Sequence, residues 1–146
     1  MRLNRSTDIG LRVLMLATAR ADQLTIDELA GSLAVPRHHL AKVVQRLQKL
    51  RLLETVRGRG GGVRLAPAAR DASVGALVRE LEGATEVVDC DGDPAEPCPL
   101  RGGCRLRGAL RVAQEAFYAS LDPITVGELA APPTRQVLLT LGTRQP

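Results

Sequence analysis

The chain has 146 residues, of which 45% are hydrophobic, but it contains only one Phe and one Tyr. This length suits one domain, or a small domain with an appended element, whose core is built from aliphatic side chains. Such a composition favours helices over sheets. The sequence shows no secretion signal and no apolar run long enough to span a bilayer, so we expect a cytoplasmic location and no membrane partner.

The net charge of +4 conceals opposite charges in the two halves of the chain. Residues 1–70 carry 13 Lys or Arg against 5 Asp or Glu, whereas residues 71–146 carry 7 against 11. A basic segment of this kind indicates a polyanionic partner such as a nucleic acid. A generally basic surface is the alternative, because 18 of the 20 basic residues are Arg.

Apolar spacing predicts three helices in the basic half. The first covers residues 6–20, with Ser6 as its N-cap. The second begins at a capping box formed by Thr25 and Glu28, and the third follows Pro36. One apolar stripe runs along the third helix, made of Leu40, Val43, Val44, Leu47 and Leu50.

Residues 51–66 predict a β-hairpin, because two β-prone runs flank the glycine-rich turn R57-G-R-G-G-G. Three helices followed by a basic hairpin are typical of a winged helix-turn-helix domain, here residues 1–70, in a mainly α fold. The third helix and the wing would bind duplex DNA, since the chain lacks the aromatic platform that single strands require. The candidate contacts are Arg37, His38, His39, Lys42 and Gln45 in the helix and Arg57, Arg59 and Gly60 in the wing. Alternatively, the two histidines are ordinary solvent-exposed side chains, and the glycines only form the hairpin turn without contacting DNA.

Residues 71–146 predict a short helix at 73–82, a cysteine loop at 84–104, a long helix at 104–122 and a loosely held C-terminal tail. The long helix carries a stripe of Leu106, Leu110, Ala113, Phe117 and Leu121. Because the winged domain is complete without it, this stripe needs another surface. Packing against a second copy in a homodimer is one solution, and folding back onto its own domain is the other.

Cys90, Cys98 and Cys104 are the only cysteines, spaced C-x7-C-x5-C. Structural zinc sites usually pair their cysteines as C-x2–4-C, which is absent here. A catalytic cysteine would need a nearby base, but both histidines lie in the predicted recognition helix, so no enzyme is expected. An iron–sulfur cluster with a fourth ligand from elsewhere suits three thiols in a flexible loop. A zinc site or redox-active thiols, as in an electron-transfer protein, stay open.

The segments V87-V-D-C90, P97-C-P-L-R-G-G-C104, T7-D-I-G-L-R12 and R57-G-R-G-G-G62 resemble those of the NsrR-type nitric-oxide-sensing repressors, which are winged-helix iron–sulfur regulators. The resemblance covers nearly the whole chain. It implies a homodimer that binds a DNA operator and holds one [4Fe-4S] cluster per chain, with a [2Fe-2S] cluster as the alternative. The three cysteines would be ligands, and the partner subunit's Asp8 would be the fourth. Without the resemblance, Asp8 is an acid in a first helical turn, where it is favourable against the helix dipole.

The gap of seven residues between Cys90 and Cys98 is longer than in the nitric-oxide sensor that the chain most resembles. A gap of this length also occurs in iron-responsive members of the same family. Nitric oxide is therefore the expected signal, and iron or cluster status is the alternative.

Overall fold

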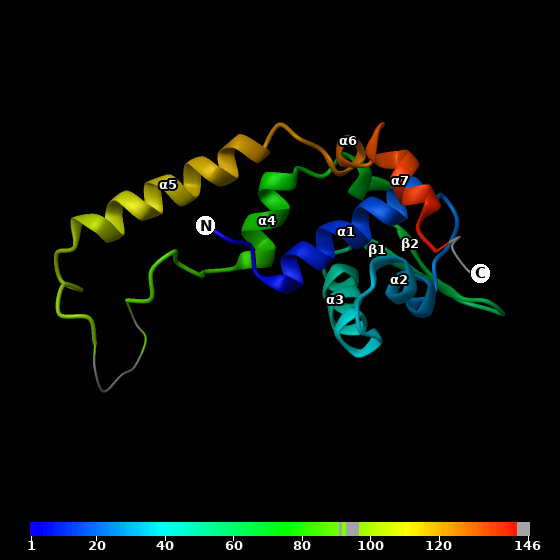
Figure 1. Ribbon diagram of the computed structural model, residues 1–146, viewed down its shortest axis with the longest axis horizontal. Helices are drawn as coiled ribbons and strands as arrows, with labels where there is room; N and C mark the ends of the chain where they lie inside the picture. Colours follow the sequence, from blue (N-terminus) through cyan, green and yellow to red (C-terminus); the bar gives the residue numbers. More distant parts are fainter. Residues whose placement is uncertain (91, 93–96, 143–146) are drawn as a thin grey trace.

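The computed structural model describes residues 1–90, 92 and 97–142. It is mainly helical with one small hairpin, as the sequence predicts (Figure 1). The elements in chain order are α1 (Arg5–Ala19), α2 (Ile26–Leu33), α3 (Arg37–Lys49), β1 (Leu53–Val56), β2 (Gly62–Leu65), a 3-10 helix (Pro67–Asp71), α4 (Val74–Glu82), α5 (Arg105–Leu121), α6 (Val126–Leu129) and α7 (Thr134–Thr140). None of the described helices is long and apolar enough to cross a membrane.

The winged helix-turn-helix arrangement is confirmed in α1, α2, α3 and the β1–β2 hairpin. The strands pair antiparallel, with Leu53 opposite Leu65 and Val56 opposite Gly62. Leu24 extends this sheet by exchanging two backbone hydrogen bonds of 2.8 Å with Val63. This bridge ties the base of the wing to the segment that precedes α2.

Of the two helix N-caps predicted from the sequence, one is confirmed and one is wrong. Thr25 and Glu28 form the expected capping box on α2, because the Thr25 hydroxyl accepts from the Glu28 amide and the Glu28 carboxylate accepts from the Thr25 amide. The assignment of Ser6 as the cap of α1 is wrong. Asn4 caps that helix instead, and its Oδ1 accepts from the Thr7 amide at 2.8 Å. A contact far along the chain fixes this start, since the Asn4 amide donates to Glu82 Oε1 at 3.0 Å.

The apolar stripe of α3 lies in the main core, as its spacing predicts. Leu40, Val43, Val44 and Leu47 are all buried, and Leu50 is half-buried at the C-cap. They pack against α1, whose Val13, Leu14 and Leu16 are fully shielded from solvent. Burying one face of α3 leaves its opposite face exposed, which positions that face for a partner.

The expectation of a loosely held tail is wrong as far as residue 142. Both α6 and α7 pack against α1, and Val126, Ala130 and Leu138 are buried in the main core. The guanidinium of Arg20 also donates to the carbonyl oxygen of Leu141. The core therefore draws residues from both halves of the chain, while residues 143–146 lie outside the described residues.

The long helix α5 extends away from the core and contacts mainly α4 (Figure 1). Tyr118 is the buried residue of α5 and packs with Val74 and Val78 in a second, small core. Arg79 fastens the same junction, because its guanidinium bonds both Glu115 and Asp122 at 2.5 and 2.6 Å. The cysteine loop therefore lies at the far end of a helix that is anchored near its C-terminus.

Candidate functional site

The exposed face of α3 presents the side chains predicted to contact DNA. Arg37, His38, Lys42 and Gln45 are exposed there. Arg37 Nε donates to Asp27 Oδ1 at 2.6 Å, and both side chains are more than two-thirds exposed. A pair this exposed is weak, so the guanidinium can leave it for a base edge or a phosphate.

His39 differs from the other candidates because it is half-buried. Its Nε2 lies 3.5 Å from the hydroxyl oxygen of Ser6 on α1. His39 and Ser6 line a cavity of about 340 Å³ together with Lys42 and Arg46. This side chain therefore faces the junction of α1 and α3 rather than the open face of the recognition helix.

Arg46 is a basic residue of α3 that the sequence-based list omitted. It is exposed, and its Nη2 donates to the carbonyl oxygen of Glu80 at 2.9 Å. The signal was present in the sequence, because Arg46 follows Lys42 by four residues and so lies on the same helix face. The contact with Glu80 joins α3 to the C-terminal end of α4.

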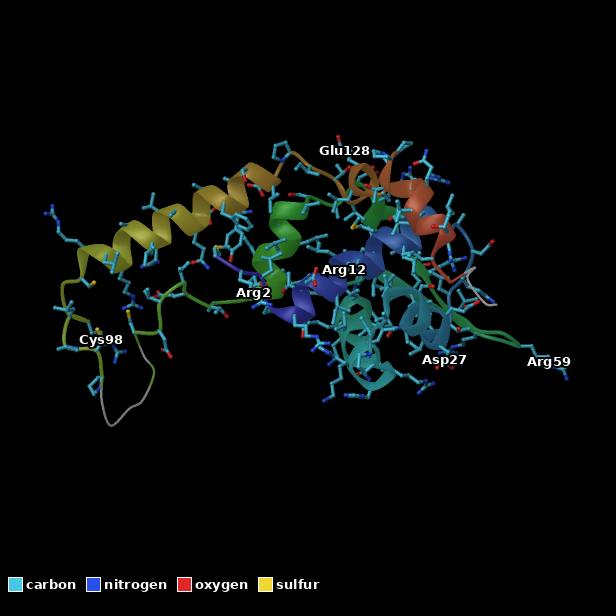
Figure 2. The ribbon with its side chains drawn as sticks, in the orientation of Figure 1. Arg2, Arg12, Asp27, Arg59, Cys98 and Glu128 are labelled. Atoms are coloured by element: carbon cyan, nitrogen blue, oxygen red, sulfur yellow. The ribbon has the colours of Figure 1, made fainter. Side chains whose placement is uncertain are left out.

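The wing projects from the body of the molecule with Arg59 at its tip (Figure 2). Arg57, Arg59 and Gly60 are all exposed. Gly58 and Gly60 adopt φ angles of +118° and +73°, which favour glycine, and Gln23 Nε2 donates to the Gly60 carbonyl at 2.6 Å. The glycines therefore shape the turn, and the turn carries two cationic side chains outward.

Cys90, Cys98 and Cys104 belong to the loop between α4 and α5, far from α3 and the wing (Figure 2). Cys104 is the N-cap of α5, and its Sγ accepts from the Arg107 amide at 3.4 Å. Cys90 is buried, and this burial raises the pKa of its thiol, while the Arg107 charge lowers it and the Cys98 and Cys104 charges raise it.

Thiolates are suitable ligands for iron–sulfur clusters and for zinc, so the donor chemistry fits such a group. Within residues 1–90, 92 and 97–142, however, no three His, Cys, Asp or Glu side chains converge closely enough to hold a metal ion. Residues 91 and 93–96, which fill most of the gap between Cys90 and Cys98, lie outside the described residues. The described part of one chain therefore contains suitable metal-binding side chains but does not bring three of them together at one site.

Asp8 lies in the first turn of α1 and is not brought to its own chain's cysteines. Its side chain is 45% exposed and forms an i,i+4 ion pair with Arg12 at 2.8 Å. It also lines an open cavity of about 660 Å³ with Arg2 and Arg5. The carboxylate is therefore accessible from outside the chain.

The predicted stripe of α5 is largely uncovered. Leu106 is 62% exposed and Phe117 is 37% exposed, Ala113 is exposed, and Leu110 and Leu121 are half-buried. Val112, on another side of the helix, is 72% exposed. A shallow cavity of about 520 Å³ runs beside α5 from Gly108 to Tyr118. Exposed apolar surface on this scale marks an interaction site more often than it marks ordinary solvent-facing surface.

Residues 3–132 match the family model Rrf2, described as "Iron-dependent Transcriptional regulator". The chain belongs to the Rrf2 family. It is 57% identical over 147 residues to the HTH-type transcriptional repressor NsrR of Streptomyces coelicolor, covering 99% of this chain and 98% of that protein. The HTH-type transcriptional regulator NsrR of Geobacillus kaustophilus is 40% identical, covering 88% of this chain and 89% of that protein.

Solved structures of Rrf2-type regulators share the fold. The oxidized form of CymR from Staphylococcus aureus has a TM-score of 0.64 at 24% identity, covering 89% of this chain and 96% of that one. IscR of T. potens has a TM-score of 0.65 at 20% identity, covering 88% and 85%. The predicted fold class and the resemblance to NsrR-type repressors are confirmed. The chain is an NsrR-type transcriptional repressor of the Rrf2 family, a group of DNA-binding regulators and not of enzymes.

Proposed function

We propose that the chain is a homodimeric repressor that releases its operator when nitric oxide reacts with a [4Fe-4S] cluster. The observation that carries this proposal is the 57% identity, over nearly the full length, to the NsrR repressor of S. coelicolor. Three thiols on one loop, at the end of a helix with an uncovered apolar face, agree with it. Residues 1–70 would bind DNA, and residues 71–146 would supply the cluster loop (84–104) and the dimerisation helix (104–122).

The uncovered apolar side chains of α5 support the dimer. Leu106 and Phe117 are exposed large hydrophobic residues of the α5 stripe, and covering them would stabilise the protein by about 25 cal/mol for each Å² removed from water. A second copy of α5 presents the same apolar surface, so a twofold axis satisfies both chains at once. Two recognition helices related by such an axis suit a palindromic operator.

The cluster would be held by Cys90, Cys98 and Cys104 of one chain and by the partner subunit's Asp8. When bound, it would supply iron that reacts directly with nitric oxide. A carboxylate oxygen is a harder ligand than a thiolate and a weaker partner for cluster iron, so it would leave one iron more accessible. In the single chain the Asp8 carboxylate is held by Arg12, so ligation in the dimer would compete with that exposed ion pair.

DNA binding would use the exposed face of α3 and the wing. Arg37, His38, Lys42 and Gln45 would face the major groove, and His39 would act at the α1–α3 junction. The wing arginines, Arg57 and Arg59, would follow the backbone or the minor groove, where negative potential attracts arginine, with Gly60 allowing a close approach. Loss of the Asp8 ligand would release α1, which packs on α3, and would thereby uncouple the two recognition helices of the dimer.

The test is anaerobic purification followed by titration with nitric oxide, with visible absorption and DNA binding recorded together. The probe is a duplex that the cluster-loaded protein selects from a random pool. We expect a brown dimer that binds this duplex and releases it as the absorption bleaches. A colourless protein that contains zinc would refute the cluster. A brown protein that keeps its DNA under nitric oxide, but loses it on iron chelation, would favour an iron sensor.

Asp8→Ala and Arg12→Ala together test the fourth ligand. Both variants break the same ion pair, but only the first removes the carboxylate. If Asp8 ligates iron, Asp8→Ala alone changes the absorption spectrum and the rate of reaction with nitric oxide. If Asp8 only stabilises the helix, the two variants behave alike.

A further inference from the structure

An ion pair joins the two segments that flank the cysteine loop. Glu86 precedes Cys90 by four residues, and Arg107 follows Cys104 by three. Arg107 Nε donates to Glu86 Oε2 at 2.7 Å, and its Nη2 donates to Glu86 Oε1 at 2.9 Å. Two parallel bonds between a guanidinium and a carboxylate fix direction as well as distance. The loop that carries the three thiols is therefore closed at its base.

Arg107 also contacts one end of the loop through its backbone. Its amide donates to Cys104 Sγ at 3.4 Å, so the same residue orients the Cys104 thiol and holds Glu86. Farther along α5, Gln114 Nε2 donates to the carbonyl oxygen of Thr85 at 2.8 Å. Residues 85 and 86 thus lie against α5, and only three residues separate this attachment from Cys90.

The environment of this pair makes it stronger than an ordinary surface ion pair. The Arg107 and Glu86 side chains are only 28% and 27% exposed. The Arg107 guanidinium lowers the pKa of Glu86, and Arg111 Nε adds a longer contact at 4.0 Å. Partial burial reduces the screening of this pair by solvent, so it restrains the loop more than a fully exposed pair would.

We propose that Glu86 and Arg107 form a clasp that positions Cys90 and Cys104 for the cluster. The clasp holds the ends of the loop at a set separation before any iron binds. Folding of the apo chain therefore already restricts the loop, and less conformational entropy is lost when the thiols bind the cluster. Glu86 and Arg107 are positioning residues and contact the cluster only through the cysteines. This inference rests on the proposed cluster, but the clasp itself is a property of the apo chain.

The test compares Glu86→Ala with Glu115→Ala in the full-length protein. Glu115 also pairs with an arginine at the α4–α5 junction, but it lies away from the cysteine loop. The rate of cluster loss to a chelator under anaerobic conditions is measured for each. We expect Glu86→Ala to lose its cluster about 10-fold faster than wild type, as for other residues that orient metal ligands, and Glu115→Ala to remain within about twofold of wild type. The charge-exchanged double variant, Glu86→Arg with Arg107→Glu, should recover most of the loss.

A second readout needs no cluster. In the apo protein, a thiol reagent should label Cys90 faster in Glu86→Ala than in wild type or Glu115→Ala, because the buried thiol becomes more accessible. Equal labelling and equal cluster loss in the two variants would overturn the clasp. Failure of the charge exchange to restore either rate would also overturn it. If wild type holds no cluster, the proposed function fails, and the labelling rates alone decide the clasp.

Discussion

Two buried helical glycines should respond in opposite ways to alanine. At Gly75 in α4, an added Cβ would lie 2.5 Å from the Tyr118 carbonyl oxygen and 2.7 Å from the Asp122 amide nitrogen. These are backbone atoms at the end of α5, so a rigid helix would have to move. At Gly10 in α1, the nearest atoms are Leu81 Cδ1 at 3.6 Å and the Val43 side chain at 3.7 Å, which are ordinary contacts.

The magnitudes follow from helix propensity, burial and strain. Replacing Gly by Ala inside a helix stabilises by about 0.5–1 kcal/mol, and burying the new methyl adds at most about 0.8 kcal/mol. We therefore expect Gly10→Ala to raise the free energy of unfolding by about 1 kcal/mol. At Gly75 overpacking costs about 1–3 kcal/mol, which exceeds any gain from helix propensity near the first turn. Gly75→Ala should lower the free energy of unfolding by about 1–2 kcal/mol.

Urea unfolding followed by far-ultraviolet circular dichroism measures both variants. The protein concentration must be the same throughout, because the proposed association of two chains would make the free energy of unfolding depend on it. An unchanged dependence of the free energy on urea would show that the midpoints report stability. The reasoning is refuted if Gly75→Ala is as stable as wild type, or if Gly10→Ala is destabilised by more than about 1 kcal/mol.

Three further predictions concern single side chains. The fully buried Thr7 Oγ1 finds no hydrogen-bond partner in the described part of the chain, so Thr7→Val should raise the free energy of unfolding by about 1 kcal/mol in urea titrations, whereas Thr7→Ser should lower it. Arg59→Ala should weaken binding to every duplex tested and reduce the slope of log affinity against log salt by about 1, measured by fluorescence anisotropy. The backbone amide of Thr25 lowers the pKa of Glu28 below its ordinary 4.5, so this carboxylate stabilises the fold above that pH and the contribution disappears as the pH falls through the lowered pKa. Glu28→Gln should therefore flatten the loss of stability in acid, measured by urea titrations across that range.

Sequence patterns correctly predicted the features that depend on residues close together in the chain. The capping box at Thr25 and the stripe of α3 depend on residues three or four apart, and both are confirmed. The cap of α1 was wrong because Asn4 and Ser6 can both accept from helix amides, and the choice depends on Glu82, 78 residues away. The tail was wrong for a similar reason, since only a distant surface on α1 could show that Leu138 is buried.

The spacing of apolar residues did not identify the face of α5 that packs against α4. Adjacent aromatic residues, Phe117 and Tyr118, lie on different faces of the helix, and the apolar stripe includes only the first. The structure buries Tyr118, because Gly75 allows α4 to approach α5 closely and Arg79 lies over the Tyr118 ring at 5.5 Å. The predicted stripe was therefore left uncovered, and that surface is the one expected to meet a second chain.

The C-terminal end of α4 lies between the cysteine loop and the helices of the proposed DNA-binding domain. The Glu80 carbonyl accepts from Arg46 on α3, and Glu82 accepts from the amide of Asn4, which caps α1. The next residues lead directly into the segment held against α5 by Glu86. Hydrogen bonds of 3.0 and 2.9 Å therefore link the end of α4 to α1 and α3. Sequence patterns predicted the cysteine loop and a DNA-contacting helix, but they could not predict these contacts between residues far apart in the chain, because each contact depends on how α1, α3 and α4 pack.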